Sequence, residues 1–213
     1  MRATGVMEYR PPVSEPAVSA PPLADPTPLG LIGLSVGCAA LLPAAFGVKA
    51  SLTPDGLRIA AMFCLLFGAG GQFLAGLMSF VNKNVLGGTL FTAFSFNWIM
   101  NWWSLTELAH GHLPNSAVVL SVDLCFLLVF LVMTVAFGFH SKLLLLFLGD
   151  IDLLYVCRIL RDVLHAPAFG VGIAWLTVGL LAIALYLAFA LVLNAASGRA
   201  LLPLGGPAFG AKG

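Results

Sequence analysis

Two aspartates stand in the middle of a long apolar stretch, and they are the residues of this sequence best placed to do chemistry. Asp150 and Asp152 lie within residues 143–160, which are otherwise mostly hydrophobic. On a helix the two side chains point roughly 200° apart, so they cannot share one face. A charge at the centre of an apolar span costs at least ~3 kcal/mol, which makes such residues candidates for function. Each is a candidate proton-binding or polar switch.

Asp123 is a third acidic candidate for the same role, because it lies roughly two turns into another apolar stretch, residues 116–139. The alternative for Asp150 and Asp152 is a structural ion pair with Arg158 or Arg161, or with a partner on another protomer. Arg158 precedes Asp162 by four residues, a spacing at which two side chains meet on one helix face. We expect these two residues to pair with each other.

Hydroxyl groups mark a further apolar stretch, residues 85–105. Thr89 and Thr92 share one helix face with Phe96. Hydroxyls that line a pore can replace the hydration water of a carboxylate. The alternative is hydrogen bonding between packed helices, which is common for threonine in membranes.

Other reactive residue types lack the grouping that catalysis or metal binding requires. The four cysteines lie in apolar stretches without CxxC spacing, which indicates packing roles. His110 and His112 have no third ligand nearby in the sequence, so we expect no metal site. No nucleophile elbow or phosphate loop is present. We therefore expect neither an enzyme nor a cofactor, and the net charge of +1 does not suggest a nucleic-acid partner.

The composition places these residues in a lipid bilayer. Hydrophobic residues make up 60% of the chain and charged residues 9%, against roughly 25% charged in soluble domains. A membrane-spanning helix needs about 20 apolar residues, and only helices or closed barrels satisfy their backbone groups there. The predicted fold is all-α, a polytopic membrane protein with a six-transmembrane-helix bundle. The predicted spans are 29–48, 57–81, 85–105, 116–139, 143–160 and 169–194.

The spans divide the chain into three parts. Residues 1–28 hold seven prolines and are predicted to be a disordered Pro-rich tail. Residues 29–194 form the transmembrane domain, and 195–213 a short C-terminal tail. An even number of spans puts both termini on one side, where basic residues are slightly more numerous, so we expect cytoplasmic termini.

Small residues recur at close-packing spacing in the first two spans. Gly33 and Gly37 form a GxxxG motif, and Gly68, Gly71 and Gly76 follow in the second span. They allow close helix contacts, either within one bundle or between protomers.

Three segments of the sequence resemble the acetate uptake transporter family, which includes bacterial succinate–acetate permeases. Residues 25–34 are similar to the family's Asn-Pro-Ala-Pro-Leu-Gly-Leu signature at the first helix, residues 68–98 keep several family positions in register, and residues 186–203 resemble its last helix and exit. The register positions include Gln72, Asn84, Thr89 and Trp98. Together the similarity extends over residues 25 to about 206.

The resemblance implies a hexamer, with a solute pathway through each protomer. The richness in Ala, Leu and Gly and the short loops suggest a bacterial inner-membrane location. The narrow point that the resemblance implies falls on Leu34, Phe94 and Ile151, and Gln72 and Asn84 join the pathway. The signature segment adds Pro28, Leu29 and Gly30. Free N–H groups at a helix start favour an anion, although a plain Pro-started helix is the alternative.

Several positions depart from the family pattern. Ser79 and Leu191 replace two family glutamates, Phe94 replaces a tyrosine, and Asp25 stands where the family has asparagine. Asp25 can cap the first helix, but its charge would compete with an incoming anion.

These observations favour a transporter or channel for acetate or a related short monocarboxylate such as succinate, with proton coupling through the aspartates. Because Ser79 and Leu191 replace two glutamates of the family, a second hypothesis stays open, a conduit for a neutral solute such as ammonia or urea. A membrane scaffold that does not transport is a third.

Overall fold

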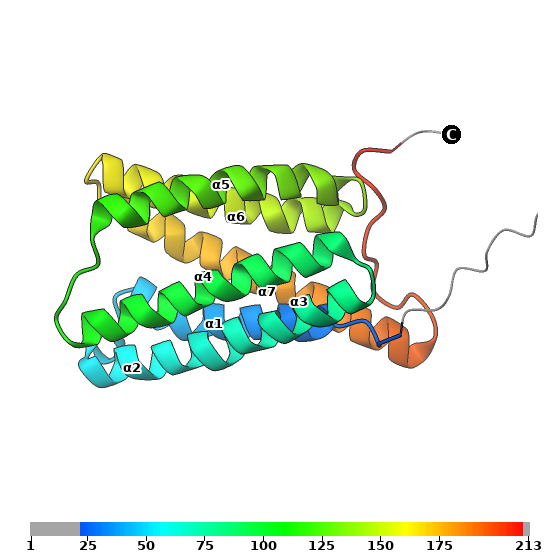
Figure 1. Ribbon diagram of the computed structural model, residues 1–213, viewed down its shortest axis with the longest axis horizontal. Coiled ribbons are helices and arrows are strands. Elements are labelled where there is room, and N and C mark those ends of the chain that lie inside the picture. Colours follow the sequence, from blue (N-terminus) through cyan, green and yellow to red (C-terminus); the bar gives the residue numbers. More distant parts are fainter. Residues whose placement is uncertain (1–21, 211–213) are drawn as a thin grey trace, which may run out of the picture.

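The computed structural model describes residues 22–210, and this part of the chain is all-helical, without strands (Figure 1). Most of the predicted Pro-rich tail, and the last three residues, lie outside the described residues. The elements are α1 (Thr27–Ala45), η1 (Lys49–Leu52), α2 (Pro54–Phe63), η2 (Cys64–Gly71), α3 (Gln72–Val81), α4 (Val85–Ala109), α5 (Ser116–Gly138), α6 (Lys142–Val163) and α7 (Phe169–Ser197).

Each predicted span is helical, but the second is not a uniform α-helix. The segments α2, η2 and α3 form one continuous rod, Pro54–Val81, whose middle part η2 is a π-helix. The wider π-helical turn coincides with the glycines at positions 68, 70 and 71, which offer no side chain to resist close packing. π-Helical segments are rare overall, and those that do occur are often found at functional sites.

The first helix ends earlier than the sequence predicts, at Ala45 and not at Val48. Gly47 has a φ of 72°, and its N–H donates to the Ala44 carbonyl while the Val48 N–H donates to the Pro43 carbonyl. This pair of hydrogen bonds is a Schellman motif, which closes a helix where glycine adopts the left-handed conformation.

Four helical segments among the described residues are long and apolar enough to cross a membrane. They are Thr27–Ala45, Pro54–Val81, Ser116–Gly138 and Phe169–Ser197. The other two long helices, α4 and α6, contain the buried polar residues Asn97 and Asp152. Polar groups in a membrane-spanning helix normally face the interior of a bundle, and both helices contribute to the walls of the cavity described below.

The helices form a bundle of two halves with an open space between them. The α5–α6 hairpin lies along one side, and α1, the α2–η2–α3 rod and α4 lie on the other (Figure 1). The long helix α7 joins the halves, because it packs against both α1 and α6. By contrast, α4 and α5 make few contacts with each other although they are consecutive. An interior space therefore remains beside α4.

The small residues of the first two spans pack within this single chain. A Cβ on Gly33 would lie 2.5 Å from the Phe67 carbonyl oxygen of η2, and one on Gly68 would lie 2.5 Å from the Trp98 ring. Gly37 faces the same Trp98 ring. Of the two roles predicted for these glycines, the structure shows packing inside the bundle.

The two tail segments that the structure describes, residues 22–26 and 198–210, are attached to the same end of the bundle. The Leu23 N–H donates to Asn82 Oδ1 at 3.0 Å, so the prediction that the disordered tail extends to residue 28 differs from the structure in its last residues. At the other terminus, Asn194 exchanges two hydrogen bonds with Leu202. Further along, the Ser141 hydroxyl donates to the Leu204 carbonyl.

The contact between α1 and η2 gives a stability prediction. Gly33→Ala places a methyl group against the Phe67 carbonyl oxygen, which cannot rotate away, so the helices must separate at a cost of about 1–3 kcal/mol. We expect a clear fall in the thermal unfolding midpoint in detergent. Gly149→Ala in α6 is the matched control, because a Cβ there meets nothing within 4 Å. Equal midpoints for the two variants would contradict this packing.

Candidate solute pathway

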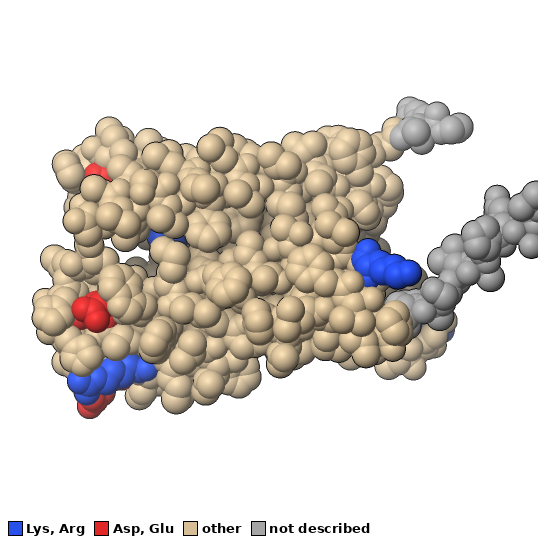
Figure 2. All heavy atoms as spheres, viewed as in Figure 1, with Lys and Arg blue, Asp and Glu red and all other residues tan. Residues whose placement is uncertain are grey.

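A cavity of about 940 Å³ opens at the end of the bundle where α4 ends and α5 begins. Figure 2 shows it as a hollow between the two halves of the molecule, with a basic side chain at its inner edge. Its walls come from α1, α4, the α4–α5 loop, α5, α6 and α7. The described tail segments lie at the opposite end of the bundle, where α1 starts and α7 ends (Figure 1).

Apolar side chains close the inner end of the cavity. Phe94 of α4 and Ile151 of α6 both line it, and they are only 6% and 1% exposed. Phe94 stacks on Phe130 of α5 with ring centroids 4.6 Å apart, and Phe130 lies 5.4 Å from the Tyr155 ring. This aromatic cluster fills the gap between α4 and the α5–α6 hairpin, so the cavity is a funnel with an apolar floor.

Two of the three residues predicted for the narrow point, Phe94 and Ile151, line this cavity. Leu34 does not line the cavity, but it is fully buried and lies one turn of α1 from Cys38, which does. Gly37 of α1 packs against Trp98 of α4, so Leu34, about one turn before it, lies at about the depth of Phe94.

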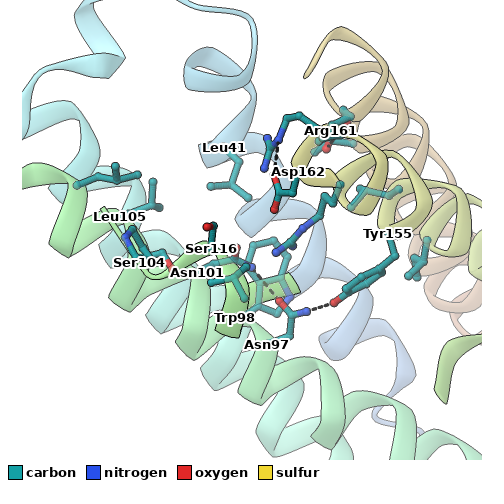
Figure 3. Close-up of a pocket in the computed structure, with 18 of the residues that line it drawn as sticks. Leu41, Asn97, Trp98, Asn101, Ser104, Leu105, Ser116, Tyr155, Arg161 and Asp162 are labelled. Carbon is teal, nitrogen blue, oxygen red and sulfur yellow. Dashed lines mark hydrogen bonds and ion pairs between the residues drawn. The ribbon is translucent and has the colours of Figure 1, made fainter. Parts of the chain in front are cut away.

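A chain of polar side chains crosses the funnel above its floor. The Asn97 Nδ2 group donates to the Tyr155 hydroxyl, and Asn101 Nδ2 donates to Asn97 Oδ1 at 3.1 Å. Figure 3 shows Asn97 and Tyr155 pointing toward one another from α4 and α6. All three residues line the cavity. A solute that reaches the floor therefore passes amide and hydroxyl groups first.

The expected pair between Arg158 and Asp162 does not form. The Arg158 guanidinium instead binds the Asp123 carboxylate of α5 through both oxygens, from Nε at 3.0 Å and from Nη2 at 2.9 Å. Asp162 pairs with its neighbour Arg161. A two-point bond across helices satisfies a buried carboxylate better than a single contact along one helix. Asp123, predicted as a switch, thus has a fixed partner in the structure.

The two central aspartates of α6 point in different directions, as their spacing requires. Asp152 faces α5, where its Oδ2 lies 2.6 Å from the Thr134 hydroxyl. Asp150 faces α7, since a Cβ on Gly179 would lie 2.9 Å from its Oδ1. Each carboxyl group has one buried oxygen without a hydrogen-bond partner among the described residues. Neither residue lines the cavity.

The signature segment lies at the opposite end of α1. There Asp25 accepts from the Thr27 N–H, and the Gly30 N–H donates to the Pro26 carbonyl. Pro28 has no N–H to donate, and the Leu29 N–H has no hydrogen-bond partner among the described residues. Gly30 itself is buried against the Phe91 ring.

The other predicted pathway residues lie away from the funnel. Gln72 is 1% exposed in α3, and its Oε1 has no partner among the described residues. Asn84 caps α4 by accepting from the Gly87 N–H. Thr89 is exposed on the outer surface, and Thr92 faces Gly76 of α3.

Sequence reasoning missed Tyr155 and the pairing of Asp123 with Arg158. The register of the α5–α6 hairpin could have predicted the pair between Asp123 and Arg158. Asp123 is seven residues into α5 and Arg158 is five residues from the end of α6, so antiparallel packing puts them at similar depths, roughly 8–10 Å from the helix ends. Comparing depths would have favoured this pair over the one predicted within α6.

The fold is shared with a known channel. The solved structure titled "Structure of the bacterial acetate channel SatP" matches with a TM-score of 0.77 and 26% sequence identity, covering 86% of this chain and 99% of that one. No protein-family model and no curated protein matches this sequence. The structural match confirms the predicted resemblance to the acetate uptake transporter family.

The contact between Thr134 and Asp152 gives a second prediction. Thr134→Val removes the hydroxyl beside a buried carboxyl group, which costs about 1–3 kcal/mol. We expect a lower unfolding midpoint for this variant, and a much smaller further loss when Asp152→Asn is added. A double-mutant cycle in detergent measures this coupling. Strictly additive effects would show that the two side chains do not interact.

Proposed function

Starting from the confirmed resemblance to the acetate uptake transporter family, we propose that this protein is a membrane channel or transporter for acetate and related short monocarboxylates. The observation that supports it best is the funnel with an apolar floor, on a fold that matches an acetate channel over nearly the whole of both chains. A site built for catalysis would need reactive groups held together, and the funnel holds amides, hydroxyls and paired charges.

The two zones of the funnel suit a small amphiphilic anion. The polar wall, with Asn101, Ser104 and Thr177 among its residues, offers groups that replace part of the hydration shell of a carboxylate. The floor at Phe94 and Ile151 offers no hydrogen bonds, so only a small and largely dehydrated solute passes it. Conduction requires that such binding be favourable enough for entry and weak enough for release.

The membrane arrangement that we propose uses all of the long helices. In it, α4 and α6 also cross the bilayer, shielded by the four apolar segments, and residues 29–194 form the transmembrane domain. The ends of α3 and α5 then lie with the termini on the cytoplasmic side of a bacterial inner membrane, where Lys83, Lys142 and Arg199 follow the positive-inside tendency. By resemblance to the family, the assembly is a hexamer.

The Thr134 hydroxyl has two oxygen neighbours and one hydrogen, which supports proton binding at Asp152. The Thr134 hydroxyl lies 2.8 Å from the Phe130 carbonyl and 2.6 Å from Asp152 Oδ2, yet it has a single hydrogen to donate. Both contacts are hydrogen bonds only when Asp152 carries a proton and donates it to the hydroxyl. This geometry supports Asp152 as the proton-binding switch, in preference to the ion-paired Asp123.

The experiment that tests the proposal is uptake of radiolabelled acetate into proteoliposomes that contain the purified protein. We expect uptake well above that of empty liposomes and competition by propionate. Competition by urea or ammonia instead would favour a neutral solute. Uptake no faster than in empty liposomes, with an intact oligomer, would overturn the proposal.

The narrow point gives a selectivity prediction. Ile151→Ala removes side-chain volume from the floor, so the ratio of butyrate to acetate uptake rises several-fold. Ile151→Val, which removes one methyl group, gives a smaller rise and guards against loss of folding, since it costs only about 0.5–1.5 kcal/mol. An unchanged ratio in both folded variants would place the selective constriction elsewhere.

A further inference from the structure

The Arg158 guanidinium is used on only one of its two donor edges. Guanidinium has five N–H donors in a fixed plane. Asp123 takes the edge formed by Nε and Nη2, at 3.0 and 2.9 Å. Within residues 22–210, the hydrogen bonds of Arg158 run from Nε and Nη2 to Asp123, so Nη1 keeps its donors to spare.

Arg158 is the member of the ion pair that lines the funnel. Arg158 lines the cavity and its side chain is 22% exposed, whereas the Asp123 side chain is 3% exposed and does not line the cavity. The guanidinium also lies over the Tyr155 ring, with its central carbon 5.3 Å from the ring centroid. The carboxylate behind it and the ring beside it hold the guanidinium in one orientation.

From this geometry we infer that Arg158 is a carboxylate-binding residue of the funnel, which receives the anionic group of an entering monocarboxylate on its free edge. The inference rests on the proposed function and adds to it a binding site above the apolar floor. Guanidinium and carboxylate match each other as planar two-point partners. Asn97 and Tyr155, next along the polar chain, lie between this site and the floor.

Asp123 sets the strength of the site as well as its orientation. An unpaired arginine inside the bundle would hold an anion too tightly for rapid passage, since charge interactions strengthen away from water. Asp123 cancels most of that charge. The other charged residues of the cavity, Arg161 and Asp162, pair with each other at 3.2 Å and cancel likewise. What remains is a weak, directional carboxylate site, as conduction requires.

A purely structural ion pair is the competing account, and the two differ in what they predict for transport. If the pair only joins α5 to α6, replacing it by a neutral pair of similar shape changes stability without changing acetate binding. If Arg158 binds the solute, the same replacement weakens binding in protein that is still folded.

The test measures the concentration dependence of radiolabelled acetate uptake in proteoliposomes of the full chain. The main variant is the double replacement Asp123→Asn with Arg158→Gln, which keeps the shape of the pair and leaves no buried charge unpaired. We expect its half-saturating acetate concentration to rise by about tenfold or more, because the variant loses a charge-assisted hydrogen bond to the carboxylate. Asp123→Asn alone should lower the half-saturating concentration and also lower the maximal rate.

The controls separate this inference from the proposed function. Arg58→Gln, which removes a surface arginine paired only with Asp55, should leave both constants unchanged. Wild-type protein without uptake overturns the proposed function itself. Wild-type uptake with an unchanged half-saturating concentration in the double variant overturns the role of Arg158 alone.

If the double variant fails to assemble, Arg158→Lys decides the matter, because it keeps the charge and loses the second donor edge. A raised half-saturating concentration then supports the inference, and an unchanged one refutes it.

Discussion

Polar groups inside an apolar bundle must find partners there, and this constraint governs the structure. The backbone satisfies it by forming helices throughout the described chain. Side chains satisfy it by pairing across helices, as Arg158 does with Asp123 and Asn97 with Tyr155. These bonds tie α4, α5 and α6 together on the walls of the funnel. Three of these four residues, Arg158, Asn97 and Tyr155, line the cavity.

Close packing on one side of the bundle makes the open space on the other possible. The glycines of α1 and η2 let those helices and Trp98 approach within contact distance, which closes that side to solute. Beside it, α4 and α5 scarcely touch, and the aromatic cluster around Phe130 fills only the inner part of the gap. The π-helical segment η2 lies opposite this gap, where it accommodates the Trp98 ring that also lines the cavity.

The sequence predicted the helices well because long apolar stretches admit few alternatives in a membrane. It also predicted that Asp150 and Asp152 would face different neighbours, since helical geometry alone decides that. It failed where the outcome depends on tertiary contacts. The partner of Arg158 lies 35 residues away along the chain, and the π-helical form of η2 depends on packing against α1 and α4. At the α1 start, Asp25 caps the Thr27 N–H, as its place before the first helix suggested.

The central claim is that the funnel carries the solute, and chemical blockage of the funnel tests it most directly. In a protein whose native cysteines are replaced, Ser104→Cys on the funnel wall is modified with a bulky, charged thiol reagent that does not cross membranes. Asp55→Cys, exposed at the same end but outside the cavity, is the matched control. We predict that modification abolishes acetate uptake at position 104 and leaves it unchanged at position 55. Full modification at position 104 with undiminished uptake would contradict the account.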